Sequence, residues 1–337
     1  MEKATEDISI FWWNVYDFYH FDNSTRNQNN GQRWPASDKE YQLKCNAIDN
    51  ALRAFITEHG KPTIIALGEI TAKSASDLKD RLFPEYNLIS LDVKPGAPSL
   101  QLAILHKKTI QGVELTEAPP IVVPYTHKST RPMAVLNISS NNSIIQCIVC
   151  HWPAKFEDGS EKCRERIADY LSQYVYDFLN TDSLKNKKKK STILIGDFNQ
   201  EPFEKSVWSD LNTHRHRARA FDKHWTDKDI KRVHLYNCSW RLLGELSPLL
   251  PSGNMKNAAG TYYWKKKKSW HNLDHVIVSQ GLLGTTPPFI DESSLTIIAL
   301  PEFIPSGVPE KFSITQDGHS GLSDHLPLFA TIKMELH

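Results

Sequence analysis

The 337-residue sequence lacks any apolar run long enough to cross a bilayer as a helix, so a helical membrane span is not expected. It also lacks an excess of charge, because 40 Lys and Arg stand against 39 Asp and Glu. With a formal net charge of +1, an argument for a polyanionic partner has to be local. Residues 1–7 are too charged for a signal peptide, which predicts a cytoplasmic protein.

Cysteine is scarce, and its five positions form an odd, scattered set that does not predict a disulfide framework. Cys147 and Cys150 lie in one predicted strand, where residues three apart point to opposite faces, so we expect buried free thiols. The chain also lacks a Cys/His zinc set, a Walker loop and a Ser-His-Asp signature. Without linkers or repeats, residues 1–337 are predicted to form a single domain.

The most informative segment is the apolar run 192–195, which ends at Gly196 and is followed by Asp197 and Asn199. Such a β-branched run predicts a buried strand. Residues two apart in a strand project to the same side, so Asp197 and Asn199 are expected to reach one place. An acceptor-only group beside an amide at the end of a rigid strand can orient a nucleophilic water.

The same design recurs along the chain. Three other apolar runs end in a single polar residue, and two more begin with an Asp-His pair. If strand starts and strand ends alternate in direction within a sheet, all six clusters can meet at one edge. Each cluster alone is readily explained as a strand end, but six made only of Asp, Glu, Asn and His indicate a catalytic site. The five further clusters are Asn14, Glu69, His151, Asp274-His275 and Asp324-His325.

Helical patterns fall between these strands, at about 38–58, at 74–82, where Ser76 and Asp77 are expected to open the helix, and at 161–179. Hairpin-like runs at 99–106 and 134–138 favour a mixed over an all-parallel sheet. Hydrophobic pattern alone therefore predicts an α/β protein.

The order of these motifs resembles the endonuclease/exonuclease/phosphatase superfamily, which contains DNase I. The match rests on Asn14, Glu69, His151, Gly-Asp-Phe-Asn at 196–199, and the Asp-His pairs that start at Asp274 and Asp324. The segment 235–279 is also similar to bacterial members with undefined substrates. This resemblance implies a DNase I-like four-layer sandwich of two mixed β-sheets, packed face to face and flanked by helices.

Carboxylates and carboxamides are hard oxygen ligands and suit Mg²⁺ or Mn²⁺. We expect Glu69 and Asp324 to hold the metal, with Asn14 sharing or orienting it. Phosphodiester hydrolysis needs a positioned water and charge neutralisation on the phosphoryl oxygens. We expect Asp197 to orient the attacking water and Asn199 to hold the attacked phosphate. Two histidines would contact the non-bridging oxygens or the leaving group, and the resemblance implies an aspartate paired with the second of them. The predicted catalytic set is His151, Asp197, Asn199, Asp274 and His325.

Cationic segments near these motifs are candidates for substrate binding. A lysine turn flanked by two tryptophans is the pattern for engaging phosphates and stacking bases, although a solubilising hairpin turn would look the same. The predicted substrate-binding set is Lys155, Arg164, Trp264, Lys265, Lys266, Lys267, Lys268 and Trp270. A further basic segment, 214–219, suits either phosphate contact or an exposed helix balanced by nearby aspartates.

Together these features predict a divalent-metal-dependent phosphodiesterase, most simply a nuclease acting on DNA or RNA, with nucleic acid as its partner. One alternative is a phosphatase or phosphodiesterase of small phosphorylated molecules or lipid head groups on the same scaffold. The other is a binding module with an inactive site, which would not bind metal. Trp152 follows His151 where abasic-site endonucleases carry tyrosine, which argues against that specificity.

Overall fold

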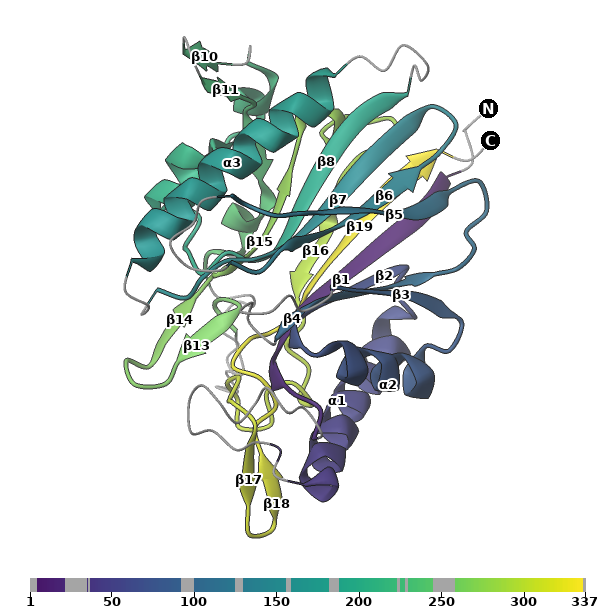
Figure 1. Cartoon of the computed structure of the whole chain (residues 1–337), viewed down its shortest axis with the longest axis vertical. Helices are drawn as coiled ribbons and strands as arrows, with labels where there is room; N and C mark the ends of the chain where they lie inside the picture. The colour runs from purple at the N-terminus through teal and green to yellow at the C-terminus, as the bar shows by residue number, and fades with distance from the viewer. Residues whose placement is uncertain are drawn as a thin grey trace, which may run out of the picture.

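The computed structural model describes residues 5–21, 35, 37–91, 100–124, 130–155, 159–181, 188–222, 225–227, 230–244 and 258–335. Two mixed β-sheets form its centre (Figure 1). The six-stranded sheet has the order β16 (Phe289–Ile297), β19 (Leu328–Glu335), β1 (Thr5–Phe18), β2 (Ile64–Ile70), β4 (Gln101–Lys107) and β3 (Tyr86–Ser90). Because β1 pairs with β19, the two ends of the described chain lie side by side in this sheet.

The seven-stranded sheet carries the segment that the sequence singles out. Its order is β5 (Glu114–Ile121), β6 (Met133–Ser139), β7 (Ser143–His151), β8 (Lys189–Asp197), β15 (Asp274–Val278), β12 (Leu235–Asn237) and β9 (Thr213–His214). Strand β8 is parallel to β7 and antiparallel to β15. The mixture of directions agrees with the hairpin-like runs in the sequence, although residue 99 lies outside the described residues.

Three helices complete the layers. α1 (Asp38–His59) and α2 (Ala72–Leu82) lie against the six-stranded sheet, and α3 (Ser160–Asn180) covers the outer face of the other sheet (Figure 1). This arrangement confirms the predicted four-layer sandwich. All three helices form where their apolar spacing predicts them. The expected start of α2 at Ser76 and Asp77 is wrong, because Thr71 caps the helix by accepting a hydrogen bond from the Ser74 N–H at 3.3 Å.

Smaller elements project from the sandwich. They are the hairpins β10 (Trp225–Asp227) with β11 (Ile230–Arg232), β13 (Tyr262–Trp264) with β14 (Ser269–His271), and β17 (Ser313–Thr315) with β18 (Gly318–Ser320), and the short helices η2 (Ser206–Asp210), η3 (Arg217–Phe221), η4 (Cys238–Leu242) and η5 (Gln280–Leu282). Among the helices in the described ranges, none has the length and apolarity needed to cross a membrane.

Strand β1 is buried on both faces, which explains its unbroken apolar run. Phe11 packs against Phe55 of α1, with ring centroids 4.6 Å apart. Trp12 points the other way, and its indole N–H donates to Asp274 in the facing sheet at 2.7 Å. The expected alternation also holds in β7, where Cys147 and Cys150 are buried free thiols in different apolar clusters.

Gly196 allows β7 and β8 to approach closely just before Asp197. A Cβ there would lie 1.9 Å from the Cys150 carbonyl oxygen, and the backbone φ of 148° is rarely adopted by other residues. We expect Gly196→Ala to lower the free energy of unfolding by about 3 kcal/mol or more, measured by urea denaturation. Gly60→Ala is the matched control, with positive φ but open space, and should cost only about 1 kcal/mol. Equal losses would show that the contact is unimportant.

Candidate active site

Strand register brings the predicted polar groups to one edge of the paired sheets. In the seven-stranded sheet, Asp197 lies between His151 on β7 and Asp274 on β15. In the six-stranded sheet, Asn14 of β1 lies beside Gly68, the residue before Glu69. Strand β19 runs antiparallel to β1, so the segment that precedes it brings His325 to the same edge. The expected meeting of strand starts and strand ends is therefore observed.

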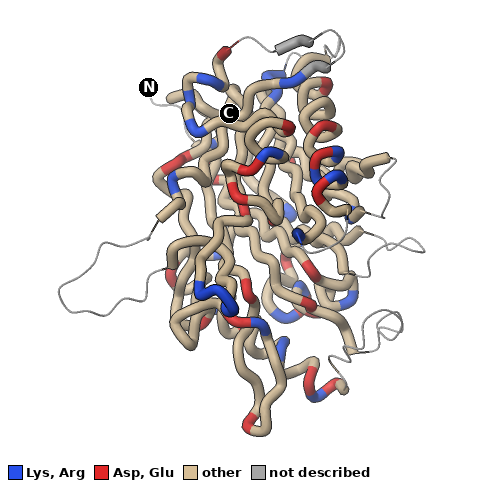
Figure 2. Tube along the Cα trace, turned by 90° about the vertical axis from the view of Figure 1, so that its left-hand side faces the viewer, with Lys and Arg blue, Asp and Glu red and all other residues tan. Residues whose placement is uncertain are grey.

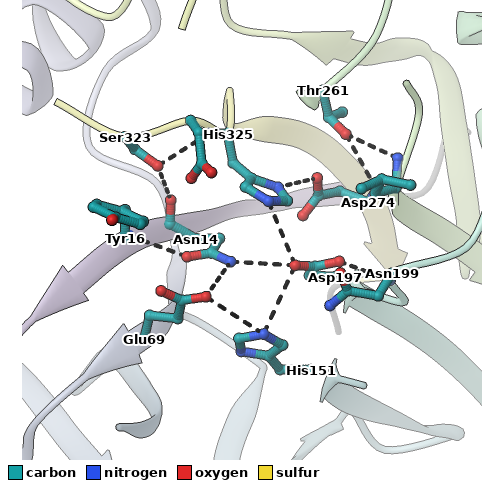
Figure 3. A network of polar contacts seen from close by, with 12 residues as sticks. Asn14, Tyr16, Glu69, His151, Asp197, Asn199, Thr261, Asp274, Ser323 and His325 are labelled. Atoms are coloured by element: carbon teal, nitrogen blue, oxygen red, sulfur yellow. Dashed lines mark hydrogen bonds and ion pairs between the residues drawn. The ribbon is translucent and has the colours of Figure 1, made fainter. Parts of the chain in front are cut away.

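Asp197 is the centre of the polar network (Figure 3). Its Oδ2 accepts a hydrogen bond from Asn14 Nδ2 at 3.2 Å and lies 3.7 Å from His151 Nε2 and 3.6 Å from His325 Nε2. Its Oδ1 accepts from the backbone N–H of Asn199 at 2.8 Å. Burial raises the pKa of Asp197 to about 7. A carboxyl group that titrates near neutral pH is suited to accept a proton from water.

His325 and Asp274 form a buried pair beside Asp197. His325 Nδ1 donates to Asp274 Oδ2 at 2.8 Å, while Trp12 donates to the other carboxylate oxygen. Burial alone would lower the pKa of His325, but Asp274 and Asp197 outweigh it and raise the pKa to about 10. His325 is therefore an imidazolium at neutral pH, with its Nε2–H directed toward Asp197 and the pocket.

His151 behaves differently although it lies within the same network. Burial, together with the Arg131 guanidinium, lowers its pKa to about 3, so the ring is neutral at neutral pH. Its Nε2 lies 3.7 Å from both Glu69 Oε1 and Asp197 Oδ2. Two neighbouring acceptors favour the tautomer with the proton on Nε2. The two histidines thus offer one charged and one neutral donor.

The same pocket carries the predicted metal ligands. Glu69 and Asp324 both line the pocket, and burial raises the pKa of Asp324, with the Glu69 carboxylate adding to the effect. Burial also opposes ionisation of Glu69. The neighbouring His151 and Arg131, with hydrogen bonds from Asp17 N and Asn14 Nδ2, outweigh burial and keep the pKa of Glu69 well below its ordinary value. Crowded carboxylate oxygens that repel one another fit a hard divalent cation.

Asn14 is oriented as a donor in this structure. Its Oδ1 accepts from the Tyr16 N–H at 3.1 Å, which directs Nδ2 toward Glu69 and Asp197. This orientation favours the orienting role of Asn14 over direct metal ligation.

A group with ligand atoms within 4.8 Å of one another also exists among the described residues, namely Asp197, Asp274 and His325. Both oxygens of Asp274 already accept hydrogen bonds, and His325 Nδ1 is a donor. The Glu69 side of the pocket is therefore the better metal site.

Backbone strain concentrates around this site. Tyr16, Asp17, Glu69 and Asn199 have φ of 52°, 44°, 58° and 51°, the left-handed region that non-glycine residues rarely adopt. They are four of the six such non-glycine residues in the described ranges. Such conformations cost free energy and persist where the surrounding fold imposes them, commonly at functional sites.

The polar network borders a pocket of about 280 Å³. The lining residues that the sequence predicted are Glu69, His151, Lys155, Asp197, Asn199, Trp264, Asp324 and His325. Asn199 lies at its edge and donates to the Trp152 carbonyl at 2.9 Å. Lys155 reaches the pocket while paired with Glu204 at 2.6 Å.

Several predicted substrate-binding residues do not line the pocket. Arg164 is buried on α3 and donates to the carbonyls of Pro153 and Ala154, so it supports the loop after His151 instead of a phosphate. Trp270 faces the core because β13–β14 register places it beside Tyr263. The lysines 265–268 form the hairpin turn outside the pocket, where Lys265 pairs with Glu310 and Lys267 covers the Trp264 ring at 4.5 Å.

Sequence reasoning missed four prominent lining residues, Tyr16, Arg131, Tyr262 and Lys311. Arg131 precedes β6, which runs antiparallel to β7, so the same rule of strand starts and ends could have found it. Tyr262 lies in β13 and forms an isolated bridge to His325. Lys311 lies 3.5 Å from Asp324 and 4.7 Å above the Tyr16 ring, and it comes from a segment with no clear pattern.

His271, to which the sequence assigned no role, also lines the pocket. Both of its ring nitrogens are hydrogen-bonded, Nδ1 to Glu201 at 2.9 Å and Nε2 to Ser269 at 3.0 Å. His271 therefore serves as part of the pocket wall. His275 points away from the pocket, as its strand position predicts, and its Nε2 contacts the Gln200 carbonyl at 2.8 Å.

A family model described as endonuclease/exonuclease/phosphatase family matches residues 13–334. The chain therefore belongs to this family of phosphoester hydrolases. No curated protein matches the sequence.

Similar solved structures include D. rerio TDP2 complexed with a single-strand DNA product, at 14% identity and a TM-score of 0.56, covering 97% of this chain and 99% of that chain. The human Nocturnin catalytic domain with bound sulfate is 16% identical, with a TM-score of 0.54 and 98% and 95% covered. The Bacteroides thetaiotaomicron mannosyl-6-phosphatase Bt3783 is 13% identical, with a TM-score of 0.54 and 96% and 99% covered. At these identities the likeness concerns the fold.

Proposed function

We propose that this protein is a Mg²⁺- or Mn²⁺-dependent phosphodiesterase that cleaves nucleic acid, with residues 1–337 acting as one domain. The observation that carries the proposal is the placement of Asp197 between a neutral His151 and a charged His325, inside a pocket that Glu69 and Asp324 also line. Pairing of β1 with β19 and the family match over 13–334 support the single domain. A cytoplasmic location stays a prediction.

Most of these side chains have a defined part in this reaction. Asp197 Oδ2 orients the attacking water and takes its proton. His325 donates through Nε2 to a non-bridging phosphoryl oxygen, while Asp274 holds its Nδ1–H and its orientation. Arg131, Lys155 and Lys311 bring positive charge to the pocket from three separate segments. Glu69 and Asp324 would hold the metal ion, which when bound supplies Lewis-acid neutralisation of phosphoryl charge.

The choice of nucleic acid as the substrate rests on local features. Lys and Arg are interspersed with Asp and Glu along the trace that this view shows (Figure 2). The pocket instead has aromatic walls, Tyr262 and Trp264, next to its cations. Flat aromatic faces beside phosphate-binding cations suit a nucleotide better than a purely anionic small molecule. The DNA product in the similar TDP2 structure is consistent with this choice.

The second candidate is hydrolysis of small phosphoesters. The pocket is only about 280 Å³, and one similar structure is a mannosyl-6-phosphatase. An inactive binding module is less compatible with the structure, because every polar group expected from the motifs is present and the carboxylates still crowd the Glu69 side.

The deciding experiment compares labelled single- and double-stranded DNA and RNA with small phosphomonoesters, in Mg²⁺, Mn²⁺ or EDTA. We expect strand cleavage that EDTA abolishes. Glu69→Gln should raise the Mg²⁺ concentration for half-maximal activity by about 10- to 100-fold, because it removes a charged ligand.

The matched control is Glu85→Gln, an exposed glutamate that pairs with Lys61 outside the pocket, which should leave the metal requirement unchanged. Phosphate release without strand cleavage would select the small-phosphoester candidate. Cleavage that persists fully in EDTA would contradict the metal requirement.

A further inference from the structure

A second hollow of about 470 Å³ lies outside the catalytic pocket. It is lined by Phe203, Trp208, His214, Arg215, His216 and Trp240, which we call the aromatic groove. Among the residues that the structure describes, the groove shares no lining residue with the catalytic pocket, and no carboxylate lines it. It combines three large aromatic rings with one arginine and two histidines.

The aromatic rings of this groove are unusually open to solvent. Phe203 is 57% exposed and Trp208 is 53% exposed, although burial of either side chain is strongly favourable. Phe203 and Trp240 lie with ring centroids 6.3 Å apart at an interplanar angle of 55°. Trp240 is half-buried, and its indole nitrogen is buried without a hydrogen-bond partner among the described residues. Phe203 and Trp208 are therefore the rings most open to stacking with another flat group.

Arg215 differs from the nearby arginines. Arg217 and Arg241 pair with Glu292, and Arg219 pairs with Asp222. Arg215 makes no ion pair with any described residue and donates through Nε to His216 at 3.2 Å. Of the arginines in this basic segment, Arg215 is therefore the one whose charge is best placed for a phosphate.

The groove is close to the catalytic edge. Phe203 follows Asn199 by four residues, so their Cα atoms lie within about 14 Å of each other. Trp240 belongs to η4, which also contains Ser239. The Ser239 hydroxyl oxygen accepts a hydrogen bond from Val276 N, and its carbonyl oxygen accepts one from Asn272 Nδ2. Those contacts attach the groove to β15, the strand that carries Asp274. About four nucleotides at the 3.4 Å spacing of a stacked strand cover the distance.

We propose that the aromatic groove binds the bases of a single-stranded nucleic acid a few nucleotides from the phosphate in the catalytic pocket, with Arg215 on the strand's phosphates. The proposal rests on the nuclease function above. A single strand is required because its bases can be turned out to stack on Phe203, Trp208 and Trp240, whereas a duplex keeps its bases paired. The groove would then favour long strands over short ones.

The test measures binding of fluorescein-labelled dT12 and dT3 by anisotropy in EDTA, on the full chain. Trp208→Ala should raise Kd for dT12 by about 5- to 150-fold, the range for loss of one stacked base, and change Kd for dT3 by less than about twofold. Arg215→Ala should lower the slope of log Kd against log salt for dT12 by about 0.7, which corresponds to one lost phosphate contact. In Mg²⁺, Trp208→Ala should likewise lower kcat/KM for cleavage of dT12 more than kcat/KM for cleavage of dT3.

Two controls match the substituted residues. Val122→Ala removes a 49% exposed apolar side chain next to β5, at the opposite edge of the same sheet, and Arg53→Ala removes an exposed arginine on α1. Both should bind dT12 like the native protein. If the native protein cleaves strands and Trp208→Ala and Arg215→Ala bind dT12 unchanged, the strand-binding role of the aromatic groove is contradicted and the nuclease proposal stands. Absence of strand binding and cleavage in the native protein would overturn both.

Discussion

Asp197→Asn is expected to lower kcat for phosphodiester cleavage by about 10²- to 10⁴-fold, the range for loss of a general base. The asparagine side chain has nearly the same shape, but it cannot take a proton from water. The loss should be seen in kcat rather than KM, because Asp197 is 1% exposed and acts on the water more than on substrate binding. Steady-state cleavage of a labelled strand with saturating Mg²⁺ measures it.

Asp49→Asn provides a matched control for this substitution. Asp49 is also a buried aspartate, but it pairs with Arg81 between α1 and α2, away from the pocket. Its replacement should reduce thermal stability and leave kcat unchanged. If Asp197→Asn retained more than a tenth of native kcat while folded, water activation would have to be assigned to another group.

Asp274→Asn should produce the second large effect, a fall in kcat of about 10²-fold or more together with a change in the pH profile. Asp274 is the neighbour that most raises the pKa of His325, to about 10 against the opposing effect of burial. Removing that charge lowers the pKa of His325, so the imidazolium is lost at a lower pH. The alkaline limb of kcat should therefore move from near pH 10 toward neutral pH.

The direction of this shift separates an electrostatic role from a structural one. A raised pKa means that the folded state binds the His325 proton more tightly, so the associated stability is complete below the ordinary pKa of about 6.5 and is lost as the pH rises through 10. Native protein should lose stability over that interval, and Asp274→Asn should lose less. An unchanged alkaline limb in this variant would mean that Asp274 only supports the local fold.

The strand ends were predictable because the physics that places them is local. Apolar runs such as 192–195 form central strands, and a polar residue at the end of a buried strand can only face the open edge of the sheet. Asn14, Glu69, His151, Asp197 and His325 were found in this way. The helices were predictable for a similar reason, since apolar residues at helical spacing mark the buried face.

Residues on loops were predicted less well. Arg164 and Trp270 were proposed for the substrate because of their residue types, but packing directs the guanidinium to two carbonyls and the indole to the core. Lys311 and Tyr262 reach the pocket through tertiary contacts with Asp324 and His325. No spacing in the sequence records such contacts, because they depend on how hairpins and loops settle on the two sheets.

By itself, the sequence determined the α/β class, the ordered set of polar residues at strand ends and the family to which the chain belongs. The tertiary structure decided the chemical state of those residues. Two histidines with the same ordinary pKa become neutral at His151 and charged at His325. Both are buried near two carboxylates, but His325 donates a hydrogen bond to Asp274 at 2.8 Å, whereas His151 lies 3.7 Å from its carboxylates and is affected by the Arg131 guanidinium. Hydrogen bonding and the charge of neighbours set that difference, and both arise only when the sheets are packed together.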